Sequence, residues 1–149
     1  MPVTGVSKFE RFFRVAASVD LDKADLKRYQ DFVYQKLYDL LLIGQASAKA
    51  NQRDVLEPWD LPITKGLQEL MHEFRGIDAE IELGPILEDL AVRPPLDVAL
   101  SEGAQARLVP VVGGVSLALT RTFKIVDPDV KNPTTDHWDR VARIFDLLL

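Results

Sequence analysis

The sequence contains no cysteine and only two histidines among its 149 residues. Without thiols the chain can form no disulfide, no thiolate metal site and no cysteine nucleophile, and an intracellular location is more natural than secretion. The opening segment "MPVTGVSKFERFF" agrees, because Lys8, Glu10 and Arg11 stand where a signal peptide would need an apolar run. We therefore expect a cytoplasmic protein.

Long apolar runs are also missing. The longest, residues 108–120, contains Pro110, Gly113 and Gly114 and falls short of the roughly 20 residues that a membrane span requires. Hydrophobic residues nevertheless make up 47% of the chain and charged residues 28%, a balance typical of a folded core rather than a disordered chain. We expect a globular protein with no membrane span.

The chain lacks the excess of basic residues that is typical of proteins binding polyphosphates. It carries 18 Lys and Arg against 23 Asp and Glu, a net charge of -5, so the chain as a whole repels DNA. The charge is uneven, because residues 1–53 hold nine Lys and Arg against six Asp and Glu while the rest is acidic. The net charge thus disfavours DNA binding by the chain as a whole, but the mildly basic residues 1–53 could still contact DNA.

Motifs that carry catalysis or bind cofactors are absent as well. "MHEFRG" begins like the metal-binding H-E-x-x-H helix but has Gly76 where the second histidine would be needed. The acidic segment "DPD", residues 127–129, lacks the oxygen spacing of a calcium loop and is better explained by helix capping. We therefore predict a non-enzymatic protein with no cofactor, no metal and no small-molecule ligand.

A pair of Trp-Asp dipeptides indicates an internal repeat. "QRDVLEPWDLP" contains Trp59 and "TTDHWDRVARIF" contains Trp138, 79 residues further on. The same offset relates Asp22 to Ser101, and both are favourable residues for capping the start of a helix. Two copies of one unit are the simplest explanation.

Helical spacing of apolar residues predicts three elements in the first copy. These are a short helix at residues 9–16, a long helix from Asp22 to about Asn51, and a last helix that Pro58 opens as its first residue. The second copy repeats the order with a short element at residues 86–90, a long helix from Ser101 to about Asp127 and a last helix around Trp138. The predicted fold class is all-α.

The middle of the second long element allows two interpretations. "RLVPVVGGVSLAL" also reads as two buried strands around a Gly-Gly turn, and Pro110 inside a helix costs about 3 kcal/mol without compensation. We predict a helix with a kink at Pro110, because the repeat places a long helix here. Gly113 and Gly114 then indicate close helix packing, and Trp59 and Trp138 are expected to anchor the first turns of their helices to the core.

Short, long and short helices, with Arg53 seven residues before Asp60, resemble the histone fold. In that family such a pair clamps the second loop onto the last helix, and the guanidinium fork suits a fixed carboxylate. The second copy departs from the pattern, because Asn132 stands where Arg53 does. Its Asp139 then has Arg140, Arg143 or Lys131 as candidate partners.

Nearly the whole chain resembles a small bacterial family of unknown function in which two histone folds are fused, through "KLYDLL", "DLPITKGLQE" and "KNPTTDHWDR". The resemblance implies one compact domain, residues 1–149, made of histone folds at 7–75 and 81–149 joined by a linker at 76–83. The two folds would pair head to tail as an intramolecular pseudo-dimer, because the linker keeps them at high effective concentration.

Two functional hypotheses follow. The first is a module that associates with a protein partner or with itself, in line with the acidic balance. Residues 147–149, three leucines, would add apolar contact surface if they are not buried in the core. The second is histone-like DNA binding, which the resemblance implies by analogy. The first short helix, the start of the long helix that follows and the facing loop would then present six basic residues to the phosphates: Arg11, Arg14, Lys23, Lys27, Arg28 and Lys131.

Overall fold

The computed structural model describes residues 3–83 and 95–149 and is mostly helical, which confirms the all-α prediction. Its elements in chain order are α1 (Val3–Ala17), α2 (Lys23–Ala50), β1 (Val55–Leu56), the 3-10 helix η1 (Pro58–Asp60), α3 (Lys65–Ile81), β2 (Ala99–Leu100), α5 (Glu102–Val126) and α6 (Thr135–Leu148). The predicted short element at residues 86–90 lies outside the described residues.

The two long helices begin and end where their capping residues predict. Asp22 caps α2 and Ser101 caps α5, each accepting a hydrogen bond from the backbone N–H three residues further on. Asn51 and Asp127 follow the last residues of the two helices. The offset of 79 residues therefore relates equivalent positions on α2 and α5.

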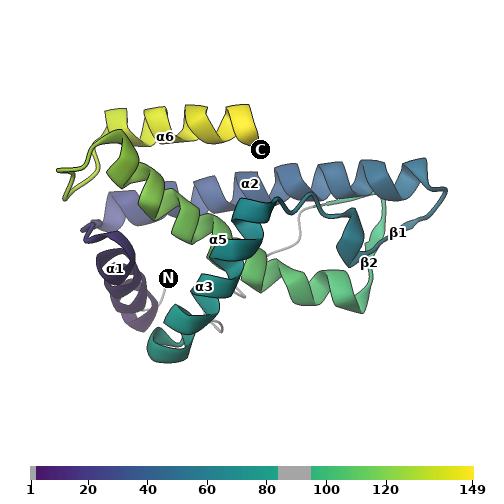
Figure 1. Cartoon of the computed structure of the whole chain (residues 1–149), viewed down its shortest axis with the longest axis horizontal. Helices are drawn as coiled ribbons and strands as arrows, with labels where there is room; N and C mark the ends of the chain where they lie inside the picture. The colour runs from purple at the N-terminus through teal and green to yellow at the C-terminus, as the bar shows by residue number, and fades with distance from the viewer. Residues whose placement is uncertain (1–2, 84–94) are drawn as a thin grey trace.

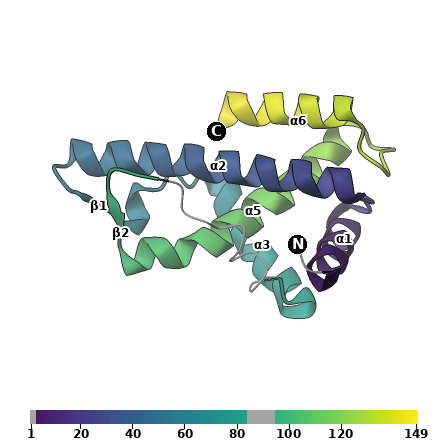
Figure 2. The ribbon, with the colours of Figure 1, turned by 180° about the vertical axis from the view of Figure 1, so that it is seen from behind.

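α2 and α5 run in opposite directions and cross in the middle of the molecule (Figure 1). The loop before each long helix meets the loop after the other. At one end β1 pairs in parallel with β2, and at the other the N–H of Asp20 donates to the carbonyl of Lys131 at 2.7 Å. Loop pairs therefore join the two helices at both ends, as the view from behind also shows (Figure 2).

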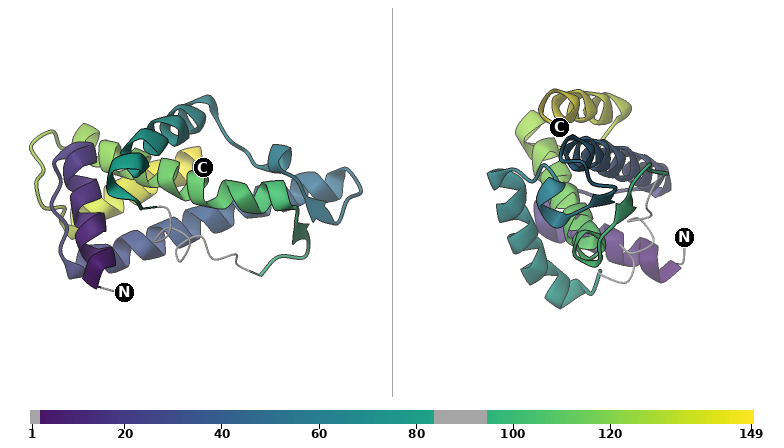
Figure 3. Two further views of the ribbon diagram at one scale, coloured as in Figure 1. Left: turned by 90° about the horizontal axis from the view of Figure 1, so that it is seen from below. Right: turned by 90° about the vertical axis from the view of Figure 1, so that its right-hand side faces the viewer.

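Aromatic side chains attach the shorter helices to this pair. On α1, the rings of Phe9 and Phe13 meet Tyr29 of α2 edge-on, with centroids 5.3 and 5.1 Å apart. On α6, Phe145 meets Phe32 of α2 with centroids 4.9 Å apart. The shorter helices thus lie on different sides of the crossing, as the views from below and from the side show (Figure 3).

The ambiguous segment is helical, so the strand alternative is wrong. α5 continues through Pro110, and α3 packs closely over the two glycines that follow. A Cβ on Gly113 would lie 2.3 Å from the ring of Phe74, and one on Gly114 would lie 2.7 Å from Cγ of Met71. Close helix packing at the glycine pair, as predicted, is what lets α3 lie on α5.

Three expectations about the first copy are wrong. Pro58 opens only the 3-10 helix η1, and α3 begins later, at Lys65. Trp59 does not anchor a helix, because it is 74% exposed, whereas Trp138 is 6% exposed and buried as expected. The expected linker at 76–83 is mostly helix, since α3 continues to Ile81.

Among the described helices, α5 is long and apolar enough to cross a membrane by length and composition, and it extends well beyond residues 108–120. In this fold 56% of its apolar stretch is buried, and the core helix of a soluble protein meets the same criteria. Its apolar character is explained by its central position between α3, α1 and α6.

Candidate interaction site

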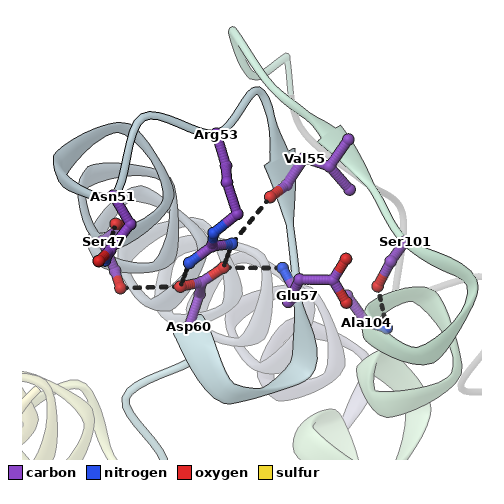
Figure 4. A network of polar contacts seen from close by, with 8 residues as sticks. All are labelled: Ser47, Asn51, Arg53, Val55, Glu57, Asp60, Ser101 and Ala104. Carbon is purple, nitrogen blue, oxygen red and sulfur yellow. Dashed lines mark hydrogen bonds and ion pairs between the residues drawn. The ribbon is translucent and has the colours of Figure 1, made fainter.

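Arg53 and Asp60 form the predicted clamp of the loop after α2 (Figure 4). The guanidinium donates from Nη1 to Oδ2 of Asp60 at 2.6 Å and from Nη2 to Oδ1 at 2.8 Å. Oδ1 also accepts the Ser47 hydroxyl, and Oδ2 accepts the N–H of Glu57, both at 2.8 Å. Because Nη1 further donates to the carbonyl of Val55 at 3.2 Å, the pair ties α2, β1 and η1 together.

The clamp holds Asp60 in its charged form. The hydrogen bonds from Arg53 lower the pKa of the Asp60 carboxyl well below its usual range, against an opposing effect of burial, and they raise the pKa of Arg53. Asp60 is almost fully buried while the side chain of Arg53 is 31% exposed. Both carboxylate oxygens of Asp60 thus accept hydrogen bonds from groups of the loop or of α2.

The second loop is closed by a different pair. Asp139, at the position equivalent to Asp60, is exposed and makes no ion pair among the described residues. Instead Nε2 of His137 donates to Oδ2 of Asp127 at 3.0 Å, while its Nδ1 accepts the N–H of Thr134 at 2.9 Å. The hydrogen bond from His137 lowers the pKa of Asp127. His137 therefore joins the end of α5 to the start of α6.

The structure gathers the six residues predicted to contact DNA at one end of the molecule, where the loop before α2 meets the loop before α6. They lie on α1 (Arg11, Arg14), in the first turns of α2 (Lys23, Lys27, Arg28) and in the loop that follows α5 (Lys131). The contact between the two loops, from Asp20 to Lys131, brings these elements to the same end.

Half of these six side chains already have protein partners. Arg14 pairs with Asp20 at 3.4 Å, and Lys27 pairs with Asp31 at 3.5 Å. Arg28 donates to the hydroxyl of Thr135 at 2.7 Å. The end of the molecule therefore carries both charges interleaved, and it does not form a continuous basic surface.

Apolar side chains are exposed on the last turns of α6. We call this the C-terminal surface, defined by Ile144, Leu147 and Leu148. Leu147 is 85% exposed and Leu148 76%. Two of the leucines that the sequence marked as contact surface are thus exposed, whereas Leu149 packs against the core. Several large apolar residues exposed together are unusual on the surface of a monomer.

Two hollows flank Ile144 on this surface. The α3–α5–α6 groove, of about 370 Å³, is lined by Thr64, Leu67, Leu70, Val115, Ala118, Thr122, Ile144, Phe145, Leu148 and Leu149. The arginine hollow, of about 320 Å³, is lined by Val126, Arg140, Arg143, Ile144 and Leu147. Sequence reasoning missed the groove, because its walls come from three helices whose relative positions only the fold defines.

The repeat nevertheless contained one signal for the groove. Val115 and Ala118 on its floor are equivalent, by the offset of 79, to Lys36 and Asp39 on α2. There the two charged residues pair with each other at 3.4 Å, and Lys36, which is buried, also pairs with Asp146 of α6. The α2 side of α6 also has a hollow, of about 380 Å³, but charged residues such as Lys36 and Asp146 line it, whereas no charged residue lines the groove on the α5 side.

Other buried polar groups pair within the core. The Tyr29 hydroxyl lies 2.6 Å from that of Ser116, and burial raises the pKa of Tyr29. Nε1 of Trp138 donates to Asp25 at 3.0 Å. In the part of the chain that the structure describes, no group of three or more His, Asp or Glu could hold a metal ion.

Comparison with known proteins identifies relatives that span the chain. The profile of a family described as "Domain of unknown function (DUF1931)" matches residues 9–146. A protein of Aquifex aeolicus described as uncharacterized is 26% identical over 142 residues, which cover 95% of this chain and 82% of that protein.

Two crystal structures share the fold. One, of a protein from Thermus thermophilus, is 49% identical, with a TM-score of 0.85 over 97% of each chain. The other, of a protein from Aquifex aeolicus, is 25% identical, with a TM-score of 0.84 over 97% of this chain and 95% of that one. The likeness covers almost the whole fold.

Proposed function

The chain belongs to the DUF1931 family of domains of unknown function, and from this premise we propose that it is a tandem pair of histone folds that acts as a protein-interaction module without catalysing a reaction. The histone folds would form one compact pseudo-dimer. In this proposal it works in the cytoplasm and needs no cofactor.

The arrangement of the long helices supports the pseudo-dimer. α2 and α5 cross in opposite directions, and each end of the crossing carries one loop pair, β1 with β2 and Asp20 with Lys131. Two histone folds that pair head to tail would place their loops in this way. The clamp of Arg53 and Asp60 agrees with the resemblance at its most specific point.

The exposed C-terminal surface is the observation that carries the interaction module. Leu147 and Leu148 are each more than three quarters exposed, and hollows lie on both sides of Ile144. Covering such apolar side chains contributes about 25 cal/mol per Å². A protein partner gains this energy, whereas a nucleic acid does not offer the apolar surface to obtain it.

The absence of cysteine from the sequence allows a clean test in cells. Leu147→Cys introduces a single thiol on the C-terminal surface, and Tyr34→Cys introduces one on an exposed face of α2 that lines neither hollow. The rate of maleimide labelling is measured for each variant, both purified and inside cells that naturally make the protein. We expect labelling at position 147 to slow at least tenfold in cells relative to position 34, because a partner covers it.

Equal slowing at the two positions would contradict the proposal, since crowding and reagent uptake affect both thiols alike. Labelling of the purified Leu147→Cys protein over a range of concentrations separates partners from self-association. Protection that rises with concentration in the purified protein would assign the surface to a second copy.

The second candidate function is histone-like binding of DNA. Its support is that Arg11, Arg14, Lys23, Lys27, Arg28 and Lys131 gather at one end of the molecule. Against it stand the net charge of -5 and the partners that Arg14, Lys27 and Arg28 already have. We therefore rank it second.

A further inference from the structure

Resting on the proposed function, we propose that the α3–α5–α6 groove binds an amphipathic helix of a partner protein, and that acidic residues flank the apolar face of that helix.

The shape of the groove suits a helix. Val115, Ala118 and Thr122 form its floor on α5 at spacings of three and four residues, which place them on one face. Leu67 of α3 and Phe145 of α6 stand on opposite walls. The small side chains of the floor leave about 370 Å³ open, and an added helix presents its own apolar residues at the same spacing.

The charged residues beside the groove indicate which side chains should border the apolar face of the bound helix. No charged residue lines the groove itself, so the helix face that enters must be apolar. The adjoining arginine hollow shares Ile144 with the groove, and its lining includes Arg140 and Arg143 but no carboxylate. Arg140 is partly neutralised by Asp136 at 3.0 Å, whereas Arg143 is exposed without an ion pair among the described residues. Acidic side chains beside the apolar face would pair with these arginines.

A second copy of this chain fits this chemistry less well. A two-fold axis through Ile144 would bring Arg143 of both copies together on the same surface. The α2 side of α6 carries a hollow of about 380 Å³, but charged residues such as Arg28, Lys36 and Asp146 line it, so it is no apolar counterpart of the groove. The arrangement thus favours one helix from a different protein.

The test uses the whole protein and two designed peptides as probes. Both are dye-labelled amphipathic helices of about 18 residues with leucines at helical spacing. One peptide carries glutamates on both flanks of the leucine face, and the other carries lysines. In a fluorescence anisotropy titration, we expect the acidic peptide to bind about tenfold more tightly than the basic one, and added salt to reduce this difference.

Variants assign the binding to the groove and to the arginines. Ala118→Trp fills the floor and should abolish binding of both peptides. Arg143→Glu should remove the preference for the acidic peptide while leaving the fold intact, since Arg143 is exposed. Arg107→Glu is the matched control, because Arg107 is an exposed arginine on α5 that lines neither hollow.

Three results would overturn the inference. The first is equal affinity of the wild type for the two peptides, and the second is no binding of either peptide. The third is an equal loss of preference for the acidic peptide in Arg107→Glu and in Arg143→Glu. Slow maleimide labelling of Leu147→Cys in cells would still support the interaction module in each of these cases. Failure of the inference about the groove can therefore be told apart from failure of the proposed function. A dimer in sedimentation that Ala118→Trp dissolves would assign the groove to a second copy and also overturn the inference.

Discussion

Trp59 and Trp138 occupy equivalent positions in the two copies but differ in burial and in hydrogen bonding. Trp138 is buried and donates its indole N–H to Asp25 on α2. The offset of 79 places Ala104 on α5 at the position equivalent to Asp25, so Trp59 has no carboxylate to bond there and is 74% exposed. The two tryptophans also lie on different kinds of element, Trp59 on the 3-10 helix η1 and Trp138 on the α-helix α6.

Trp138→Phe should therefore be much more destabilising than Trp59→Phe. The first change removes the hydrogen bond to a buried carboxylate and leaves unfilled volume, at a cost of about 1–3 kcal/mol in the free energy of unfolding. The second should change it by less than about 0.5 kcal/mol. Urea unfolding at neutral pH measures both values, and equal losses would show that the tryptophans are equivalent after all.

Arg53→Ala should lower the midpoint of thermal unfolding by roughly 10 °C, because it leaves the buried Asp60 carboxylate without its cation. Arg53→Lys should recover only part of the loss, since a lysine cannot donate to both oxygens in the fork geometry that the guanidinium uses. Calorimetry of the two variants provides the comparison. A midpoint within error of the wild type for Arg53→Ala would mean that the clamp does not hold the loop.

Asp60 should also make stability depend on pH in a defined window. Its pKa is lower in the folded chain than the ordinary value of about 3.9, so the unfolded state binds more protons on acidification. The contribution is complete above about pH 5 and is lost as the pH falls below about 4 toward the folded pKa. The gap in unfolding free energy between the wild type and Asp60→Asn should narrow between about pH 6 and about pH 3. A gap that stays constant would contradict the assignment.

Elements with capping residues and regular apolar spacing could be predicted from the sequence, and elements shaped by packing could not. Asp22 and Ser101 identified the starts of α2 and α5, because a cap acts through its own backbone neighbours. The prediction of a long helix beginning at Pro58 was wrong, because a proline also acts only on its own backbone neighbours. It opens a helical turn, but Pro62 follows within four residues, and the chain extends before Thr64 caps α3.

Replacing a glycine by alanine on α5 or on α3 should have opposite effects on stability, because only the glycine on α5 lies in close helix packing. Gly113→Ala should destabilise the fold by about 1–3 kcal/mol, because its Cβ would lie 2.3 Å from the ring of Phe74. Gly76→Ala, on α3 with nothing within 4 Å of the new Cβ, should stabilise it by about 0.5–1 kcal/mol. Denaturant unfolding measures both. A destabilising Gly76→Ala would argue that this position is a linker rather than helix.

At the level of the whole molecule, the surfaces depend on contacts between distant segments. The six basic residues share one end because the loops around Asp20 and Lys131 meet, and this location was predictable only through the histone-fold resemblance. The α3–α5–α6 groove was not predictable at all, since it depends on how far α3 and α6 stand apart over α5. The leucines at the end of α6 were visible in the sequence, but their exposure was not.

The charge of the whole chain separates the two functional proposals. If the protein acts through apolar contacts with another protein, its acidic surface should repel duplex DNA. The interleaved carboxylates at the basic end leave few cations free to neutralise phosphates, with Arg14 paired to Asp20 and Lys27 to Asp31.

The most direct measurement is a fluorescence anisotropy titration of a labelled duplex of about 30 base pairs with the whole protein, at about 50 mM and about 200 mM salt. A protein-interaction module predicts no binding even at the lower salt concentration. Binding at the lower concentration that weakens steeply at the higher one would report several neutralised phosphates, and it would make the chain a histone-like DNA binder despite its net charge.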